Sequence, residues 1–570
     1  MFGGKSTIVW MAALAVAPLF MWSLPALADE DGEDCPCCYV PDAGDNPLLA
    51  RYENPDNEDG APGSELGYVS FEVTGDEAIR EDFDRALGYL HHMMYIYARE
   101  TFEDIAERDP DCAMAYWGIA TSLFQPLWPG RPSEEDLQRG WDTINEARER
   151  VESDREEKLI EATAAFFREP ETADFWTRIA RWAEGMEDAY AAHPDCVDTA
   201  ALYGLSRVTL AQVVQNRDPL LDDAENVLRD IFEQHPTHPG AIHYSIHATD
   251  VDGRAENALD MVEAYGQIAP DVPHALHMPS HIYVRLGNWP EVVAWNERSA
   301  KTALEYPAGD RISIHWIHAL DYKLYAYLQQ GEDEKARAVV DEAFSTEQRH
   351  QEDFVTAFHK AIMPARLAVE QRDGEAAAEL QPNHPDYVEW ERYEWPQAIT
   401  WFAKGMGYVK TDRLEQAREA EAQIIALRDA AQAAGEVQFA TYIKVDRLIL
   451  SGWLAWAEGD TEEAVALVRE AAELEPTVEK HPVTPGALLP PNEALGDLLM
   501  ELDRPDEALE AYEASDAIWP ERHNTLLGAA RAAEAAGEEE IAREYYERLL
   551  ANTGESERAV VGEARAFDGD

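Results

Sequence analysis

Histidines are concentrated in one short part of this chain. Seven of its 17 histidines lie between His235 and His281, and most of these recur at spacings of three, four and seven residues. Residues three and four apart share one face of a helix. The strongest candidates by this spacing are His243, His247, His277 and His281. Neutral imidazole is the commonest protein ligand for zinc, copper and iron, so the pattern predicts a transition-metal site.

We expect these four histidines to share one site. A pair at i, i+4 can chelate one ion from a single helix, and two such pairs on adjacent helices supply four nitrogens. Further candidate ligands fall beside them in the repeat frame described below: His238, His274, His318, Asp250 and Asp321. Because few thiolates lie nearby, the set favours copper, zinc or iron over a structural site of the zinc-finger kind.

A separate and weaker signal lies upstream, where His91 and His92 are followed by Met93 and Met94. Methionine sulfur beside imidazole suits copper. The alternative is ordinary helix packing, since methionine often fills gaps between aromatic side chains.

The elements that must position these residues follow from an internal repeat. Gly405, Gly452 and Gly496 are each followed 12 residues later by an alanine, and two of those alanines are followed after another 12 by a proline. Apolar residues between these markers have a helical period. The pattern resembles the tetratricopeptide repeat, a helix–turn–helix unit of about 34 residues. It implies an all-α solenoid, a right-handed superhelix of such units, here in two stacked repeat blocks.

The sequence motifs around the histidines resemble those of a more specific group, the exported bacterial tetratricopeptide-repeat proteins. The segments that carry this resemblance are His238–His247, His274–Ile282, Tyr325–Gly331, Leu90–Met93 and Asp111–Gly118. The resemblance implies export and a repeat fold, and it brings no settled activity with it. In the repeat frame the histidines fall on the first helix of each pair, which faces the concave groove of such proteins.

The chain divides into five segments by composition. Residues 1–28 read as a secretory signal peptide with cleavage after Ala28, which predicts a periplasmic or secreted protein. Residues 29–75 form an acidic, flexible segment containing Cys35, Cys37 and Cys38, either a metal or redox group or a disulfide in a tail. Residues 76–344 form the histidine-rich array, 345–394 an irregular helical connector, and 395–570 the second array. We expect Cys112 and Cys196, in separate repeats, to stay unbonded to each other.

The charge excludes two classes of partner. Aspartate and glutamate number 112 against 47 lysines and arginines, giving a net charge of −65. Such a field repels nucleic acid and anionic lipid. No segment after the signal peptide is long and apolar enough to span a membrane. The excess of acid with few lysines is typical of proteins from saline habitats, and an acidic secreted protein is the alternative.

Three functions remain open at this stage. The first is binding of a transition-metal ion, or of a metal-bearing ligand, in a histidine-lined groove. The second is a metal-free scaffold that binds a protein or peptide through the repeats. The third is a metal-dependent enzyme in which Asp250 or Asp321 acts as base. The sequence specifies no nucleophile and no substrate pocket, so it gives no positive sign of catalysis.

Overall fold

The computed structural model describes residues 66–214, 216–346, 348–553 and 556–568. All of them belong to one compact unit, Asn54–Asp570. Their regular structure is helical, with two isolated β-bridges and no β-strand among these residues. The predicted all-α fold is therefore confirmed. The signal peptide predicted at 1–28, and the group of Cys35, Cys37 and Cys38, lie outside the described residues.

The helices of the first part of the array are η3 (Glu77–Ile79), α1 (Arg80–His91), α2 (Tyr95–Arg108), α3 (Ala113–Thr121), α4 (Glu134–Arg150), α5 (Asp154–Phe167), α6 (Phe175–Ala192), α7 (Val197–Ala211), α8 (Asp218–Gln234), α9 (Pro239–Thr249), η4 (Ala255–Ala258), α10 (Leu259–Ile268), α11 (Pro273–His277), α12 (Pro279–Arg285), α13 (Trp289–Ala303) and α14 (Ile314–Gln329).

Those of the second part are α15 (Asp333–Ser345), α16 (Phe354–Glu370), α17 (Gly374–Ala378), η5 (Trp390–Arg392), α18 (Glu394–Lys410), α19 (Leu414–Ala433), α20 (Val437–Glu458), α21 (Thr461–Leu474), η6 (Glu475–Thr477), α22 (Pro491–Glu501), α23 (Pro505–Ile518), α24 (His523–Ala536), α25 (Glu539–Thr553) and α26 (Ala559–Asp568).

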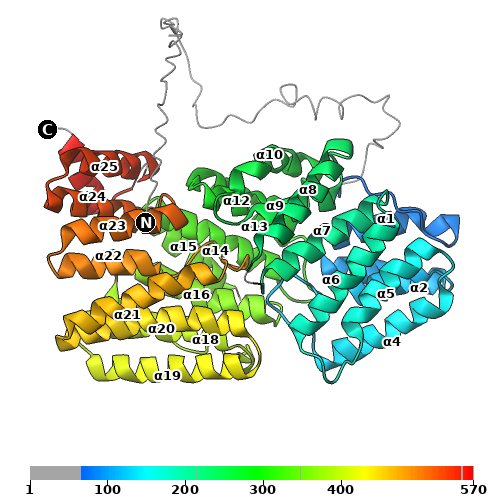
Figure 1. Ribbon diagram of the computed structural model, residues 1–570, viewed down its shortest axis with the longest axis horizontal. Helices are drawn as coiled ribbons and strands as arrows, with labels where there is room; N and C mark the ends of the chain where they lie inside the picture. Colours follow the sequence, from blue (N-terminus) through cyan, green and yellow to red (C-terminus); the bar gives the residue numbers. More distant parts are fainter. Residues whose placement is uncertain (1–65, 215, 347, 554–555, 569–570) are drawn as a thin grey trace, which may run out of the picture. The chain divides into compact units, whose positions relative to one another are not determined.

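Consecutive helices pack as pairs, and the pairs stack. α18 packs on α19, α20 on α21, α22 on α23 and α24 on α25 (Figure 1). The first helices of neighbouring pairs also contact one another, in the order α14, α16, α18, α20, α22 and α24. Helices far apart in sequence meet as well, since α1 packs on α9 and α14 on α24. The arrangement is that of helix–turn–helix repeats.

Glycine marks the points where the two helices of a repeat come closest. A Cβ added at Gly452 in α20 would lie 2.5 Å from Cγ2 of Val468 in α21, and one at Gly496 in α22 would lie 2.7 Å from Cε1 of Tyr512 in α23. Ala464, which follows Gly452 by 12 residues, is fully buried. These contacts explain why the sequence repeats a glycine and then an alanine at this interval.

The region predicted as an irregular connector, 345–394, contains a full helix of the stack. α16 packs between α14 and α18 and includes Pro364 in its interior. That proline breaks the sequence pattern without ending the helix. The rest of the region is the short α17, the turn η5 and loops.

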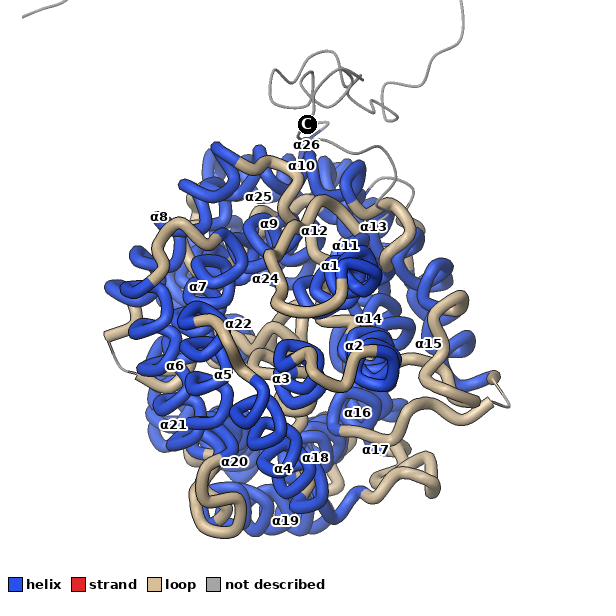
Figure 2. The backbone as a smooth tube through the Cα atoms, turned by 90° about the vertical axis from the view of Figure 1, so that its right-hand side faces the viewer, coloured by secondary structure: helices blue, strands red, loops and turns tan. Residues whose placement is uncertain are grey.

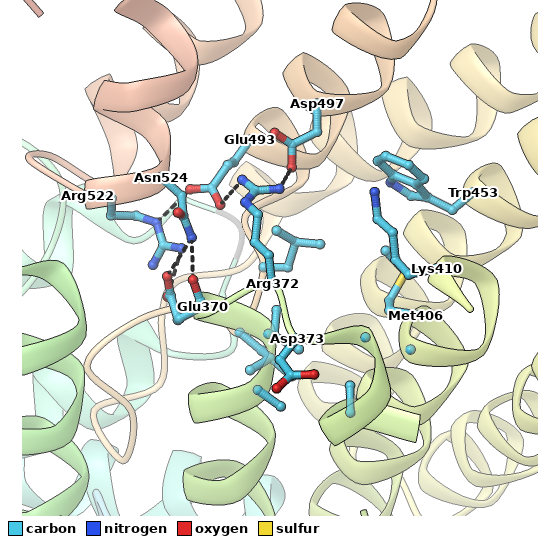
Figure 3. A pocket seen from close by; sticks show the side chains of 17 residues that line it. Glu370, Arg372, Asp373, Met406, Lys410, Trp453, Glu493, Asp497, Arg522 and Asn524 are labelled. Atoms are coloured by element: carbon cyan, nitrogen blue, oxygen red, sulfur yellow. Dashed lines mark hydrogen bonds and ion pairs between the residues drawn. The ribbon is translucent and has the colours of Figure 1, made fainter. Parts of the chain in front are cut away.

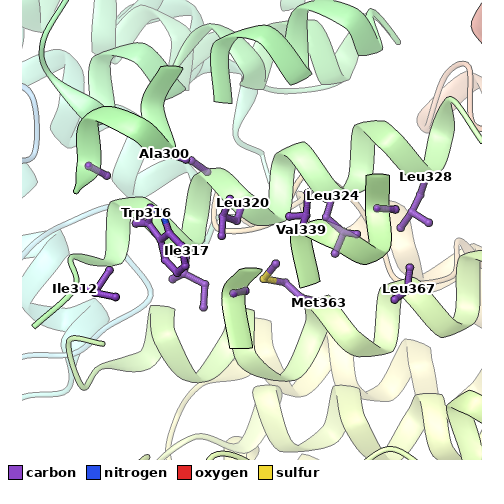
Figure 4. Close-up of a cluster of buried hydrophobic side chains, with 14 residues drawn as sticks. Ala300, Ile312, Trp316, Ile317, Leu320, Leu324, Leu328, Val339, Met363 and Leu367 are labelled. Carbon is purple, nitrogen blue, oxygen red and sulfur yellow. The ribbon is translucent and has the colours of Figure 1, made fainter. Parts of the chain in front are cut away.

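Helix α14 has two different buried faces. One face carries Ile317, Leu320 and Leu324, which join an apolar cluster with residues of α13, α15 and α16 (Figure 4). The other face carries His318 and Tyr322, which are also buried. The apolar cluster thus fixes the helix that presents these polar side chains to the interior.

Two expectations about the whole chain are also tested. Among the described residues, no helix combines the length and apolar character needed to cross a membrane. Cys112 and Cys196 are both free thiols, as predicted.

Candidate metal centre

The first pair of histidines lies on α9. Pro239 occupies the first turn of this helix, and Nδ1 of His238 caps it by accepting from the backbone N–H of Ala241 at 3.2 Å. His243 and His247 follow one turn apart, with ring centroids separated by 5.0 Å. They therefore project from the same side of α9, as their i, i+4 spacing predicts.

The second pair straddles the junction of α11 and α12, each of which begins with a proline. His277 and His281 lie one turn apart across Pro279, with ring centroids separated by 4.8 Å. α14 brings His318 to 4.2 Å from the ring of His277. Figure 2 shows α9, α11, α12 and α14 in the same region of the molecule, and α9 contacts α12 while α11 contacts α14.

These side chains form two groups of three. We call His243, His247 and His274 the 243 triad, and His277, His281 and His318 the 277 triad. Within each triad, one ligand nitrogen from each residue lies within 4.8 Å of the others. All six side chains are buried, with at most 7% of each residue exposed.

The four histidines predicted to share one site are thus divided between two adjoining groups. His243 and His247 fall in the 243 triad, and His277 and His281 in the 277 triad. The triads touch, because the rings of His247 and His281 lie 5.5 Å apart. His274 and His318, second-tier candidates in the sequence, complete the two triads.

The tautomers of the 277 triad are set by oxygen acceptors. Nδ1 of His281 lies 2.8 Å from a carboxylate oxygen of Asp250, and Nδ1 of His277 lies 2.7 Å from Oδ1 of Asn296. The amide nitrogen of Asn296 donates to a backbone carbonyl, so its oxygen is the atom that faces His277. Both oxygens only accept, so each Nδ1 carries the proton and each Nε2 carries a lone pair.

The third member of the triad is oriented by a relay. Nδ1 of His359 lies 3.2 Å from Oδ2 of Asp321, an ion-pair distance without hydrogen-bond geometry, and the carboxylate favours a proton on that nitrogen. Nε2 of His359 therefore accepts from Nδ1 of His318, at 3.0 Å. His318 is left with a lone pair on Nε2, as in the other two rings. Hydrogen-bonded outer partners of this kind orient the imidazoles that ligate metal ions in proteins.

The consequence is an unusual contact between two lone pairs. Nε2 of His277 lies 3.0 Å from Nε2 of His281. Ligand nitrogens around a tetrahedral zinc ion lie about 3.3 Å apart, because each Zn–N bond is about 2.0–2.1 Å. The two rings are therefore spaced as they would be around a shared cation.

The 243 triad has fewer partners. Nδ1 of His243 donates to the backbone carbonyl of His91 at 2.5 Å, and its Nε2 is buried with no hydrogen-bond partner in the described chain. Both ring nitrogens of His247 and both of His274 are likewise buried without a partner. Polar atoms in this state cost free energy unless a bound group satisfies them.

Burial keeps the imidazoles neutral. It lowers the pKa of His243, His247, His274, His277 and His318 well below the ordinary value, and neighbouring imidazoles add to the effect. For His281 burial also lowers the pKa, although Asp250 opposes it. Only the neutral ring has a lone pair for a metal ion. The six histidines of the two triads are therefore neutral at neutral pH, which is the form that can bind a metal ion.

Charged groups surround the carboxylate beside the 277 triad. Asp250 accepts from Arg285 at 2.9 Å and from Nζ of Lys480 at 2.9 Å. Burial alone would raise the pKa of this carboxyl, but Lys480 and Arg285 hold it well below its usual range. Asp321 is similarly paired with Arg366 at 3.2 Å. Both carboxylates are therefore ionised and already bonded, which suits them to orient histidines.

The groove predicted from the repeats is filled in this region. The segment that follows η6 returns over the histidines, where Tyr322 donates to the carbonyl of Pro482 at 2.8 Å and Arg366 donates to Oγ1 of Thr484 at 3.0 Å. From the other side the ring of Trp128 packs at 5.3 Å from that of His318. The six histidines of the two triads are therefore enclosed in the protein interior and do not line an open groove. We call these six residues the histidine core.

A small cavity remains where the two triads meet. Its lining includes two histidines from each triad: His247, His274, His281 and His318. Met93, Leu127, Trp128, Pro482 and Val483 complete it. Its volume is about 10 Å³.

The histidines of the weaker upstream signal have other partners. His91 and His238 both donate from Nε2 to Asp198, at 2.9 and 3.1 Å, and Nδ1 of His91 pairs with the hydroxyl of Tyr244. Both nitrogens of His92 are also hydrogen-bonded, to the hydroxyl of Tyr265 and the carbonyl of Leu66. These hydrogen bonds hold α1, α7 and α9 together. His91, Asp198 and His238 also form a third buried group whose ligand atoms lie within 4.8 Å of one another, close enough to hold a metal ion.

Several residues around the core were not predicted from the sequence. They are Asn296, His359, Lys480, Arg285, Arg366 and Asp198. Each reaches its partner from another helix or loop, 19–230 positions away. No local spacing marks them, because the repeat frame relates residues within a helix pair only.

A second pocket lies in the later repeats, between α16, α18, α20, α22 and α24 (Figure 3). Its charges are already paired: Arg372 with Asp497 and Glu493, and Arg522 with Glu370. Lys410 lies over the ring of Trp453, 3.9 Å from its centroid. None of the two triads' histidines lines this pocket.

Comparison with known proteins identifies one repeat directly. A family model for the tetratricopeptide repeat matches residues 445–478, the stretch that holds the predicted markers Gly452, Ala464 and Pro476. No curated protein matches the sequence.

Two solved structures are similar at low identity. One is the APC/C hetero-tetramer Cut9–Hcn1, with 12% identity over 86% of this chain and 89% of that chain, and a TM-score of 0.28. The other is a human IFIT1 dimer with PPP-AAAA, with 13% identity over 84% and 96% of the two chains and a TM-score of 0.38. The chain therefore contains a tetratricopeptide repeat at residues 445–478, within an all-α array of paired helices.

Proposed function

We propose that this protein binds a transition-metal ion in its histidine core, with the 277 triad as ligands. The observation that supports the proposal is the 3.0 Å separation between the Nε2 atoms of His277 and His281. The Nδ1–H groups of the two rings donate to Asn296 and Asp250, so the lone pairs on the two Nε2 atoms face each other. They repel unless a cation lies between them.

A proton is the other cation that could lie there, and the surroundings oppose it. It would convert one ring to an imidazolium inside the core. Burial lowers the pKa of His277 well below its ordinary value, and it also lowers that of His281. A metal ion is favoured because it bonds to three rings at once and repays the loss of hydration.

The chemistry of the three ligands narrows the choice of metal ion. Three imidazole nitrogens without a thiolate suit zinc, copper(II) or iron(II). Three protein ligands leave a position for a further ligand, which is the coordination of catalytic sites more than of structural ones. The signal peptide predicted at residues 1–28 supports our further proposal that the protein is exported and binds its metal outside the cytoplasm.

The test is metal analysis and titration of tag-free protein. Cobalt(II), which reports tetrahedral nitrogen coordination by its visible spectrum, and zinc serve as probes. His277→Gln should lower zinc affinity by more than about 100-fold, because even outer-shell partners contribute about 10–100-fold. Asn296→Leu should lower it by about 10–100-fold. Circular dichroism checks that both variants keep their helices.

The matched control is His350→Gln. His350 is also buried with both nitrogens unpartnered, but it belongs to neither triad. Its replacement should leave zinc affinity unchanged. Equal affinity in His277→Gln and the parent protein would contradict the proposed ligand set.

Acidification provides an independent readout. Burial holds the pKa of His277 and His318 well below the ordinary value, so protons do not displace the metal over a moderate fall in pH. Stabilisation by metal should therefore be present at about pH 7.5 and retained at about pH 5. Thermal melts with and without chelator at both values measure it. Coincident melts at the higher pH would reject metal binding and leave protein or peptide binding by the repeats as the function.

A further inference from the structure

We infer that the 243 triad binds a second metal ion, and that the two ions share one small ligand in the cavity between the triads. The inference rests on the proposed function, because it takes the 277 triad as the first site. It adds a second ion, a ligand class and a size limit.

The second ion follows from the buried nitrogens of the 243 triad. Five of its ring nitrogens have no partner in the described chain, namely Nε2 of His243 and both nitrogens of His247 and of His274. The remaining one, Nδ1 of His243, donates to the carbonyl of His91, which leaves a lone pair on Nε2. Lone unpartnered histidines occur elsewhere, at His350 and His523. Within the described part of the chain, only here do three unpartnered imidazoles converge within 4.8 Å.

Because the two triads are in contact, ions bound to them would lie close together. The ring of His247 lies 5.5 Å from that of His281, and the ring of His274 lies 5.9 Å from that of His277. Ions in two-metal sites lie about 3.5–4 Å apart and commonly share a ligand. Two triads in contact along two such edges are compatible with that spacing.

The cavity determines what can be shared. It is lined by two histidines of each triad, so a group inside it reaches both ions. Its volume of about 10 Å³ is close to the room that a single water molecule needs. The ligand class is therefore water, hydroxide or a single-atom anion such as fluoride. A ring-bearing organic substrate is too large.

A neighbouring cavity lies beside His247. It has a volume of about 40 Å³ and shares Leu127, His247 and Pro482 with the cavity between the triads. Its lining also includes the polar residues Asp250 and Lys480. The two cavities are therefore separated by few side chains.

The experiment titrates metal-free, tag-free protein with cobalt(II) and counts ions at saturation. We expect two ions per chain in the parent protein and one in His247→Gln, whose 277 triad is intact. His523→Gln is the control, because His523 is buried and unpartnered but lies outside the triads. It should retain two ions.

The shared ligand is tested by adding fluoride, and then benzoate, to each loaded protein. Fluoride should change the cobalt spectrum of the two-ion protein and bind at least tenfold more weakly to His247→Gln, which offers it one ion. Benzoate should change neither spectrum.

The outcomes distinguish a failure of the proposed function from a failure of this inference. No bound cobalt in the parent protein overturns the proposed function and this inference together. One ion in the parent protein overturns this inference and leaves the proposed function standing. Two ions in the parent protein with equal fluoride affinity in both proteins, or a spectral response to benzoate, overturns the shared small ligand.

Discussion

At the residue scale, the same side chain has two roles in this protein, and the neighbouring acceptor decides between them. His238 and His91 each use both ring nitrogens in hydrogen bonds, and these bonds link neighbouring helices. His277 and His281 have one nitrogen held by an oxygen and the other directed at a second imidazole. Burial is common to all four, and the hydrogen bonds distinguish them.

A buried carboxyl in the later repeats gives a prediction that is independent of metal. Asp446 lines a cavity with Glu475, and burial, with a smaller effect of Glu475, raises its pKa to about 8. In the unfolded chain the pKa is about 3.9. Between these values the folded state holds a proton that the unfolded state has lost, so stability declines as the pH rises. Asp446→Asn removes this decline.

The expected result is that Asp446→Asn gains stability over the parent protein from pH 5 to pH 8. The upper limit is about 4 kcal/mol, at about 1.4 kcal/mol per unit, and partial exposure of Asp446 reduces it. Urea denaturation at the two pH values measures the gain. Asp188→Asn, at an exposed position on α6, should show no such trend. A gain that is equal at both pH values would contradict the raised pKa.

Sequence reasoning found the ligand candidates and missed their supports. The i, i+4 spacing identifies His243, His247, His277 and His281, because that spacing is a property of one helix. Their division into two triads depends on how α9, α12 and α14 pack, which no spacing within a helix expresses. The acceptors Asn296 and Asp250 show the same limit, since only Asp250 fell within the repeat frame.

At the element scale, the glycine positions test how tightly the helix pairs are packed. A Cβ at Gly452 would lie 2.9 Å from the carbonyl oxygen of Ala464, a backbone atom that has little freedom to move. Gly452→Ala should therefore destabilise the protein by about 1–3 kcal/mol. Thermal or urea denaturation measures the change.

The matched control is Gly562→Ala in α26. A Cβ there meets nothing within 4 Å. Alanine is the better helix former by about 1 kcal/mol, so this variant should be as stable as the parent protein or slightly more stable. If both variants had the same effect, helix propensity and not close packing would account for Gly452.

The repeats were predictable because their markers are local. A glycine, an alanine 12 residues later and a proline after another 12 describe one helix pair, and the match at 445–478 falls on such a set. Helix α16 was harder to predict, because it contains Pro364 and a proline usually indicates a helix boundary. Packing between α14 and α18 keeps that helix continuous.

At the scale of the whole molecule, charge is the dominant feature. The sequence carries −65, and the folded chain holds these charges closer together than the unfolded chain does. Salt screens this repulsion, with a Debye length of about 10 Å at 0.1 M and about 3 Å at 1 M. The melting temperature should rise over that range.

Melts in NaCl and in KCl check this prediction, because screening depends on ionic strength and not on the identity of the cation. The two salts should act alike. A flat or falling melting temperature would show that self-repulsion is not what limits the stability of this protein.

The contact between Lys480 and Asp250 also has a consequence for the order of synthesis. The two residues are 230 positions apart. At about 5–20 residues per second, the ribosome completes Asp250 roughly 10–50 s before Lys480. During that interval α9 and α12 can already pack, but the carboxylate that orients His281 lacks one of its two cationic partners. The finished environment of the 277 triad therefore forms after translation has passed residue 480, and the metal uptake proposed for this triad would follow translation of this region.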